Sequence, residues 1–282
     1  MVSIVIPVYN YNIIALVKEL HTQLIASKIT FEIIAMDDFS RNQFIVENSE
    51  IDALSYTSFE KSTKNQGRTE IRQLLSLKAR YKWLLFLDAD VTPKNSNYIQ
   101  NYINLIPKNY DAIYGGFSYK PEAPKPDNLL RWKYGRSKEE VDASIRNKTP
   151  YKIVISANFM IKKSVFELIN SNFSDNCYGY DNYFGALLKQ QKANIFHINN
   201  EVYHLGIEPN EQFLKKTEEA TDTLLKLYQN NKIKVHDNGL LALFIKLKKY
   251  RFYYFLSYFY GTFHTQMQKN LLNRKPSILV FQ

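Results

Sequence analysis

Short apolar runs alternate with longer amphipathic patterns in the first third of the chain. Strand-length apolar runs cover residues 2–6, 31–36 and 83–87, with a weaker one near 53–57. Apolar side chains recur at helical spacing over residues 11–28, and residues 69–80 fit a second helix. This alternation predicts βαβ units and therefore an α/β fold with a mostly parallel, Rossmann-like sheet flanked by helices.

A proline-rich segment marks an internal boundary. Residues 119–126 contain three prolines in eight positions, which predicts a loop. Beyond it we expect strands at 153–155, 159–161, 195–198 and 202–205, and helices at 181–191 and 211–229. The chain is thus divided into residues 1–118, residues 119–209 as a second half of the same domain, and a helical extension over residues 210–282.

The carboxyl-terminal extension is both basic and aromatic. Residues 232–282 carry nine Lys or Arg against the single acid Asp237, out of a net charge of +10 for all 282 residues. Residues 250–263 hold nine aromatic side chains, a combination that favours an anionic membrane surface over nucleic acid as partner. The longest uncharged run, residues 252–268, is only 17 residues long, so we expect a helix lying in the interface rather than a span. The alternative is packing against the core or a second subunit, as in a homodimer.

The cysteine content and the first residues bear on location. Cys177 is the only cysteine, so the chain forms no internal disulfide, and residues 2–7 are too short an apolar run for a secretory signal. We therefore expect a cytoplasmic protein, peripheral at the inner face of the cell membrane.

Two carboxylates follow the apolar run at 83–87. Asp88 and Asp90, separated by Ala89, can share a divalent cation and leave coordination positions for phosphate oxygens. The alternative is that one of them caps the following turn. Arg68 and Arg72 lie one helical turn apart, so both are candidates to face a diphosphate.

These residues, taken together, resemble glycosyltransferase family 2, which has the GT-A fold. The resemblance rests on four motifs in the family's order across the first 90 residues: Val5-Ile6-Pro7-Val8-Tyr9-Asn10, Asp37-Asp38-Phe39-Ser40, Asn65-Gln66-Gly67 with Arg72 behind it, and Asp88-Ala89-Asp90. It implies that Pro7, Val8, Tyr9, Asn10, Asn65, Gly67, Arg68, Arg72, Asp88 and Ala89 line the nucleotide-sugar site. It also implies that Asp37 or Asp38 contacts the base or ribose.

The second half resembles the family less closely. Asp181, in Tyr178-Gly179-Tyr180-Asp181, matches the family's general base, and Tyr180 replaces a usual glutamate on the acceptor side. An aspartate at this place is also a good helix N-cap. His204 matches a histidine that completes the Mn²⁺ or Mg²⁺ site of Asp88 and Asp90 in many relatives. Asn158 is a candidate acceptor contact, and Trp132 either stacks on a sugar or fills a core.

The sequence therefore predicts an inverting glycosyltransferase. It would move a sugar from a nucleotide-diphospho-sugar, with UDP favoured, to a hydroxyl of a glycan or lipid-linked acceptor in cell-surface polysaccharide synthesis. Two alternatives stay open. A nucleotidyltransferase shares the sheet and the acidic pair but usually has a Gly-rich loop after the first strand, and a membrane-associated scaffold would need no nucleotide site.

Overall fold

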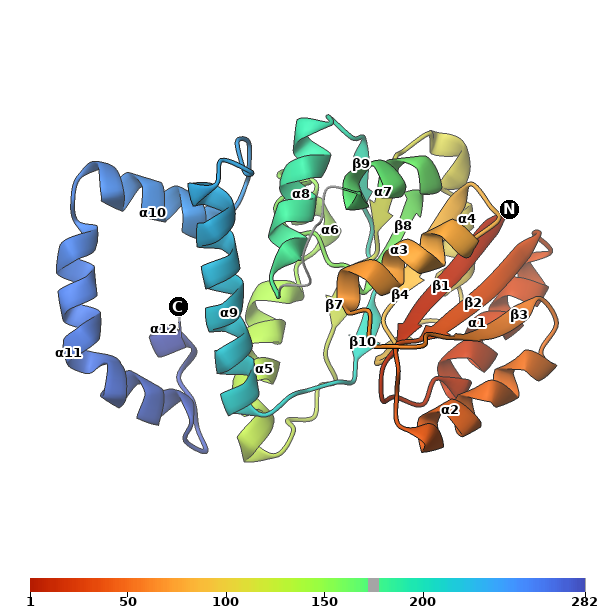
Figure 1. Cartoon of the computed structure of the whole chain (residues 1–282), viewed down its shortest axis with the longest axis horizontal. Helices are drawn as coiled ribbons and strands as arrows, with labels where there is room; N and C mark the ends of the chain where they lie inside the picture. The colour runs from red at the N-terminus through yellow and green to blue at the C-terminus, as the bar shows by residue number, and fades with distance from the viewer. Residues whose placement is uncertain (172–177, 282) are drawn as a thin grey trace.

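A seven-stranded sheet forms the centre of the molecule (Figure 1). The computed structural model describes residues 1–171 and 178–281. The sheet has the order β3-β2-β1-β4-β8-β6-β9, with β1 Val2–Val8, β2 Phe31–Asp37, β3 Thr57–Lys61, β4 Trp83–Leu87, β6 Ala112–Tyr114, β8 Asn158–Lys162 and β9 Ile195–His197. Strands β3, β2, β1 and β4 are parallel neighbours, and only β8 runs against its neighbours β4 and β6. The mostly parallel sheet is the one that the apolar runs predict.

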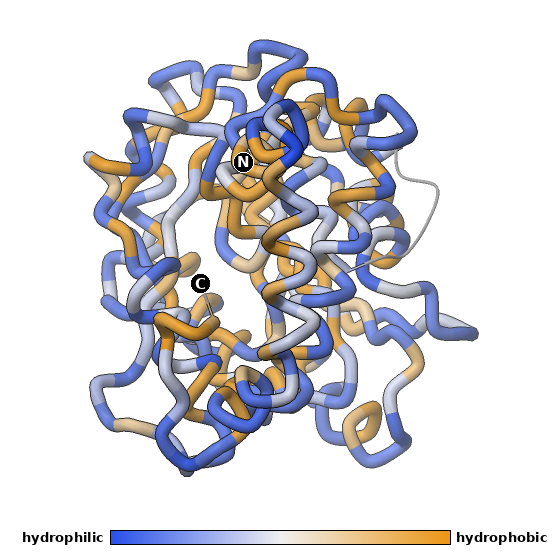
Figure 2. Tube along the Cα trace, turned by 90° about the vertical axis from the view of Figure 1, so that its left-hand side faces the viewer, coloured by the Kyte–Doolittle hydropathy of each residue, from blue (hydrophilic) through white to orange (hydrophobic). Residues whose placement is uncertain are grey.

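Helices cover both faces of this sheet and extend beyond it (Figure 1). The helices of the main body are α1 Ile14–Ser27, α2 Asn42–Asn48, α3 Arg68–Lys78, α4 Tyr98–Ile103, α5 Leu129–Tyr134, α6 Ala143–Arg146, α7 Lys163–Asn170, α8 Tyr180–Gln190 and α9 Asn210–Gln229. The carboxyl-terminal helices are α10 Gly239–Lys249, α11 Tyr253–Leu271 and α12 Ile278–Phe281. Figure 2 views the molecule from the side on which α10 and α11 lie. In the part of the chain that is described, no helix is both long and apolar enough to cross a membrane.

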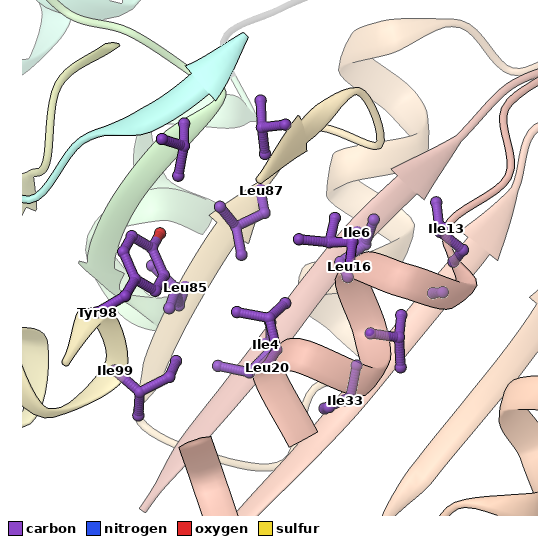
Figure 3. Close-up of a cluster of buried hydrophobic side chains, with 14 of the residues drawn as sticks. Ile4, Ile6, Ile13, Leu16, Leu20, Ile33, Leu85, Leu87, Tyr98 and Ile99 are labelled. Carbon is purple, nitrogen blue, oxygen red and sulfur yellow. The ribbon is translucent and has the colours of Figure 1, made fainter. Parts of the chain in front are cut away.

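The sheet separates two hydrophobic cores, because alternate side chains of each strand point to opposite faces. On one face Ile4 and Ile6 of β1 pack with Leu16 and Leu20 of α1 (Figure 3). On the other face Val5 belongs to the cluster that includes side chains of α3, α7 and α8. Both faces of β1 are therefore buried, which explains why its sequence is a continuous apolar run.

A second, three-stranded sheet lies next to the carboxyl end of β4. It has the order β5-β10-β7, with β5 Val91–Pro93, β10 Val202–His204 and β7 Phe117–Ser118. Strands β5 and β10 are antiparallel, and His204 pairs with Val91. This pairing brings His204, far along the chain, beside the residues that follow β4.

Two predicted strands differ from the structure. The weak strand expected near 53–57 begins at Thr57, because residues 49–53 form a 3₁₀ turn whose Asp52 accepts a hydrogen bond from the Phe59 amide (2.6 Å). Residues 153–155 are not a strand. Val154 packs against the core cluster that contains α8, so its apolar character comes from tertiary packing rather than from a sheet ladder.

A buried histidine should make the stability of the protein depend on pH. His197 is almost completely buried, with its Nδ1 2.9 Å from Nη1 of Arg146 and its Nε2 2.8 Å from the Pro150 carbonyl oxygen. Burial, with a smaller contribution from Arg146, lowers the pKa of His197 to about 4. Because the unfolded chain binds this proton below pH of about 6.5 and the native protein does not, stability falls as pH drops from about 6.5 to 4, by up to about 1.4 kcal/mol per pH unit.

Urea unfolding between pH 4 and 7 measures this dependence. His197→Gln should flatten the slope, whereas Ile195→Val removes no titrating group and should keep the parent slope. An unchanged slope in His197→Gln would show that other groups cause the dependence.

Candidate active site

The ends of three parallel strands bring the predicted donor-side residues together. Because β2, β1 and β4 are parallel neighbours, their carboxyl ends lie side by side, at the edge where α/β sheets bind ligands. The residues at this edge are Pro7, Val8, Tyr9 and Asn10 at the end of β1, Asp37 and Asp38 at the end of β2, and Asp88, Ala89 and Asp90 directly after β4. Val8 is buried, whereas the ring of Tyr9 is exposed. The fold thus places the first-half motifs at one edge.

Asp38 holds the turn that leads into α3. Its Oδ1 accepts a hydrogen bond from the amide of Gln66 (2.6 Å), and its Oδ2 accepts one from the amide of Gly67 (2.9 Å). The Asn65 side chain donates to the Asp38 carbonyl oxygen (3.1 Å). Gly67 has a φ of 81°, which disfavours any residue with a Cβ. Both carboxylate oxygens of Asp38 therefore fix the start of the arginine-bearing helix.

Asp37 is the member of the acidic pair with an oxygen not used by the protein. It is fully buried, and its Oδ2 accepts a hydrogen bond from the amide of Ser40 (2.9 Å). Its Oδ1 has no hydrogen-bond partner within the described residues. A buried acceptor without a partner is costly, and Asp37 has such an oxygen, whereas each carboxylate oxygen of Asp38 accepts a backbone hydrogen bond. The hydroxyl of Ser40 in turn accepts from the amide of Asn10 (2.7 Å), which joins the loops after β1 and β2.

Asp88 forms ion pairs with both arginines of α3. Nη2 of the buried Arg72 contacts Oδ1 of Asp88, and Nη2 of Arg68 lies 3.5 Å from its Oδ2. Arg68 also donates to the hydroxyl of Ser156 (2.7 Å). Burial lowers the pKa of Arg72, whereas for Arg68 the carboxylates of Asp181 and Asp88 outweigh burial and raise the pKa. The two arginines, one helical turn apart, thus face the same protein carboxylate.

Asp90 is paired with His204 instead. Its Oδ2 lies 3.3 Å from Nε2 of His204, and its carbonyl oxygen accepts from the amide of Leu205 (2.8 Å). Burial raises the pKa of Asp90, but the hydrogen bond and charge of His204, with a contribution from Arg68, hold it below its ordinary value. A Cβ at Gly206 would lie 1.9 Å from Oδ2 of Asp90. The glycine is therefore required for the close approach of this loop to the carboxylate.

The three predicted metal ligands are thus divided between two arrangements. Asp88 faces arginines, and Asp90 and His204 face each other. Across the described residues, no group of three or more His, Cys, Asp or Glu side chains could hold a metal ion. A carboxylate oxygen of Asp90 and an imidazole nitrogen of His204 are the kinds of donor atom that fit Mn²⁺ or Mg²⁺ as a partial ligand set. The described residues therefore do not form the three-residue cluster that the resemblance implies, and only Asp90 and His204 lie together.

Two adjoining cavities lie beside these pairs, with volumes of about 270 and 380 Å³. The larger is lined by Asp88, Asp90 and His204, and both are lined by Arg68 and Asp181. Asp181 is the second residue of α8, and the N-cap is Gly179, so the alternative that Asp181 serves as the N-cap is wrong. An acidic side chain in the first helical turn is favourable without capping. Asp181 and Arg68 therefore face both cavities, with Arg72 at the smaller one and the Asp90–His204 pair at the larger one.

The predicted acceptor residues have different positions. Tyr180 lines the smaller cavity, as an acceptor contact requires. Trp132 donates its Nε1–H to the Lys120 carbonyl oxygen (2.9 Å) and packs against the core, and it is not among the described residues that line either cavity. The structure thus favours the core alternative for Trp132.

Asn158 is a structural residue, and its expected acceptor contact is wrong. Its side chain is fully buried. Its Oδ1 accepts from the hydroxyls of Tyr98 (2.6 Å) and Tyr102 (2.7 Å), and its Nδ2 donates to the carbonyl oxygens of Gly116 (2.8 Å) and Asn200 (3.0 Å). Every hydrogen-bonding position of the amide is therefore occupied by the core.

Several cavity residues were not predicted from the sequence. Two ion pairs line the larger cavity, Arg131 with Glu139 (3.0 Å) and Lys216 with Glu208. Tyr178 lines it too. These residues come from α5, α9 and the loops around them, and no local motif marks them. The one sequence feature that points to Tyr178 is its place three residues before Asp181, in the motif that resembles the family's general-base motif. The neighbouring Cys177 lies outside the described residues.

The sequence and the fold match known glycosyltransferases. Residues 3–169 match the family model for glycosyl transferase family 2. A search of curated proteins gives no match. Glucosyl-3-phosphoglycerate synthase from Mycobacterium tuberculosis, solved with Mn²⁺, UDP and glucosyl-3-phosphoglycerate, is similar with a TM-score of 0.56 and 13% identity, over 85% of this chain and 82% of that one.

Two further solved structures resemble the chain over less of their length. Staphylococcus aureus TarS 1-349 with UDP-GlcNAc has a TM-score of 0.53 and 17% identity, over 76% of this chain and 64% of that chain. The mannosyltransferase PcManGT from Pyrobaculum calidifontis with GDP-Man and Mn²⁺ has a TM-score of 0.55 and 12% identity, over 81% and 64%. The present chain spans 59% of the length of the TarS 1-349 chain in another crystal structure of that protein. The family match covers more than half of the sequence, so this chain belongs to glycosyltransferase family 2, and its α/β fold is the GT-A fold.

Proposed function

We propose that this protein is an inverting glycosyltransferase that moves a sugar from a nucleotide-diphospho-sugar to a hydroxyl group. The observation that carries the proposal is the arrangement around two adjoining cavities of an arginine pair, an Asp–His pair and a separate carboxylate, Asp181, with Arg68 and Asp181 lining both. Cations beside a cavity suit a diphosphate, and a carboxylate across from them suits proton removal from an acceptor.

The donor side is formed by the strand edge and α3. Among the described residues no group donates to Oδ1 of Asp37, and this oxygen would accept from a base N–H or a ribose hydroxyl. Arg68, about half exposed in the cavity, is placed to contact the diphosphate, while the buried Arg72 holds Asp88. Asp90 and His204 would hold Mn²⁺ or Mg²⁺. When bound, this ion would neutralise charge that develops on the leaving diphosphate.

Asp181 is placed to act as general base. An inverting transfer needs the acceptor hydroxyl to attack from the side opposite to the leaving group, with its proton taken by a nearby carboxylate. The first turn of α8 holds Asp181 at the cavities, which Arg68 also lines. The bond to the diphosphate breaks as the new glycosidic bond forms, and the proton ends on Asp181.

The donor base and the acceptor are finer parts of the proposal. UDP is favoured because two of the similar structures are complexes with UDP or UDP-GlcNAc, although a third holds GDP-Man. The acceptor is a hydroxyl of a glycan or lipid-linked saccharide in cell-surface polysaccharide synthesis. The basic aromatic tail, which suits lipid proximity, supports this class of acceptor.

A thermal-shift panel tests the donor site. UDP, GDP, CDP and TDP are each added to the parent protein with and without Mn²⁺. A ligand that binds only the folded state at 100 times its Kd stabilises it by about 2.7 kcal/mol, so UDP with Mn²⁺ should raise the melting temperature by several degrees. A well-folded sample that no nucleotide shifts under any metal condition would overturn the proposal in favour of a scaffold.

The released product separates the transferase from a nucleotidyltransferase. Incubation with diphospho-sugars of the nucleotide that gives the largest shift, and with a saccharide acceptor, should release the nucleoside diphosphate. Release of pyrophosphate from a nucleoside triphosphate and a sugar phosphate would instead identify the other activity.

A further inference from the structure

Helix α11 stands apart from the main body of the protein (Figures 1 and 2). Every residue from position 254 to position 263 is exposed to solvent. In the described structure, the helix packs mainly against α10 and α12, which flank it in the chain, and only its last residue, Leu271, joins a buried cluster with Leu130 of α5 and Phe213 of α9. An exposed helix in water normally has a polar surface, and this one does not.

One face of α11 and of the residue before it is formed by phenylalanines. Phe252, Phe255, Phe259 and Phe263 follow one another at spacings of three, four and four residues, which places them along a single stripe. Their exposed fractions are 57, 61, 49 and 44%. Ser257, Gly261 and Thr265 fall on the opposite side of the helix. The phenylalanines therefore form a continuous stripe that the described structure leaves uncovered, and the exposed rings of Tyr254 and Tyr258 lie on the other side of the helix.

Positive charge surrounds this stripe. Residues 232–282 contain nine exposed Lys or Arg side chains, namely Lys232, Lys234, Lys246, Lys248, Lys249, Arg251, Lys269, Arg274 and Lys275. None of the nine forms an ion pair with another described residue. Asp237, the only acid of this segment, is paired with Lys189 of α8. The surface thus presents a net charge of +8 beside exposed aromatic rings.

We propose that α10 and α11 form an arm that binds the surface of an anionic lipid bilayer. The phenylalanine stripe would enter the boundary between headgroups and acyl chains, and the lysines of α10 would lie near lipid phosphates. A second copy of the chain is a poorer partner, because pairing two such surfaces would bring two sets of unpaired positive charges together.

The base of the arm is attached to the wall of the candidate active site. The ring of Phe281 in α12 lies 5.3 Å from the rings of both Tyr134 in α5 and Phe213 in α9. Lys133 donates to the carbonyl oxygen of Pro276 (2.8 Å). Tyr134 and Phe213 also line the smaller cavity. A bilayer bound by the arm would therefore be held near the cavity on the side of α5 and α9.

Vesicle flotation tests the arm with the full chain. The probes are vesicles of phosphatidylcholine alone and vesicles with about 30% phosphatidylglycerol, an anionic fraction sufficient for electrostatic binding. The parent should float with the anionic vesicles and release as salt is raised. Phe255→Ser/Phe259→Ser and Lys246→Glu/Lys248→Glu/Lys249→Glu should each weaken partitioning by at least about tenfold.

Matched variants control for apolar surface and for charge. Val46→Ser/Leu77→Ser removes two exposed apolar side chains elsewhere, and Lys18→Glu/Lys108→Glu/Lys148→Glu makes the same charge change away from the arm. Both should float like the parent. Equal loss in these controls, or binding that ignores the anionic lipid, would overturn the proposal.

Sedimentation without lipid tests whether a second copy of the chain, rather than a bilayer, covers the phenylalanine stripe. A dimer that Phe255→Ser/Phe259→Ser dissociates, together with no flotation of the parent, would assign the stripe to a second copy and overturn the lipid proposal. Nucleotide thermal shifts of the arm variants should equal those of the parent, so failure of the lipid proposal stays separate from failure of the transferase proposal.

Discussion

Asp90→Ala should abolish the metal-dependent part of the nucleotide thermal shift and reduce sugar transfer by about 10³-fold or more. Asp90 is the carboxylate that faces His204 at 3.3 Å, in a loop that only a glycine at position 206 allows so near. Losing about 4 kcal/mol of charge stabilisation at the leaving diphosphate corresponds to that factor. Calorimetric titration of Mn²⁺ into the protein with UDP measures the loss directly.

The control for this prediction is Asp222→Ala, which removes a carboxylate from the exposed surface of α9. It should bind metal and nucleotide as the parent does. If Asp90→Ala keeps the Mn²⁺-dependent shift and the parent rate, then the Asp90–His204 pair is a structural contact and the metal site lies elsewhere.

The first-half motifs could be predicted because they follow strands that the apolar pattern already identifies. A buried parallel strand is a continuous apolar run, and its carboxyl end must lie at the ligand edge. Asp38 and Asp88 were therefore located from local sequence. Their individual partners were not, because the turn held by Asp38 comes from Gln66 and Gly67, and the cations beside Asp88 come from α3.

The second-half residues depend on contacts that spacing does not encode. Asn158 occupies a place in the chain that resembles the family's acceptor-side strand, yet Tyr98 and Tyr102 approach it from α4 and use its amide in the core. Residues 153–155 have an apolar pattern of strand type, but Val154 packs against the cluster that contains α8. His204 reaches Asp90 only through the antiparallel pairing of β10 with β5. In each case the partner lies in a distant part of the chain, more than 50 residues away for Asn158 and His204, where local pattern carries no information.

Asp181→Asn should lower kcat by about 10²–10⁴-fold while leaving the metal-dependent nucleotide shift near that of the parent. The amide has almost the shape of the carboxylate but does not take a proton from the acceptor hydroxyl. The substitution leaves both the Asp90–His204 pair and the Asp88 ion pairs in place. Turnover is measured as release of nucleoside diphosphate with a saccharide acceptor that supports the parent reaction.

Two readouts separate a general base from a residue that merely supports α8. The pH profile of kcat/KM should lose its acidic limb in Asp181→Asn, whereas a structural role would lower the whole profile evenly. Asp222→Asn makes the same chemical change on the exposed surface of α9 and should leave the profile intact. If Asp181→Asn retains kcat within about threefold of the parent, far less than general-base loss requires, then another carboxylate of the larger cavity, such as Glu139 or Glu208, takes the proton.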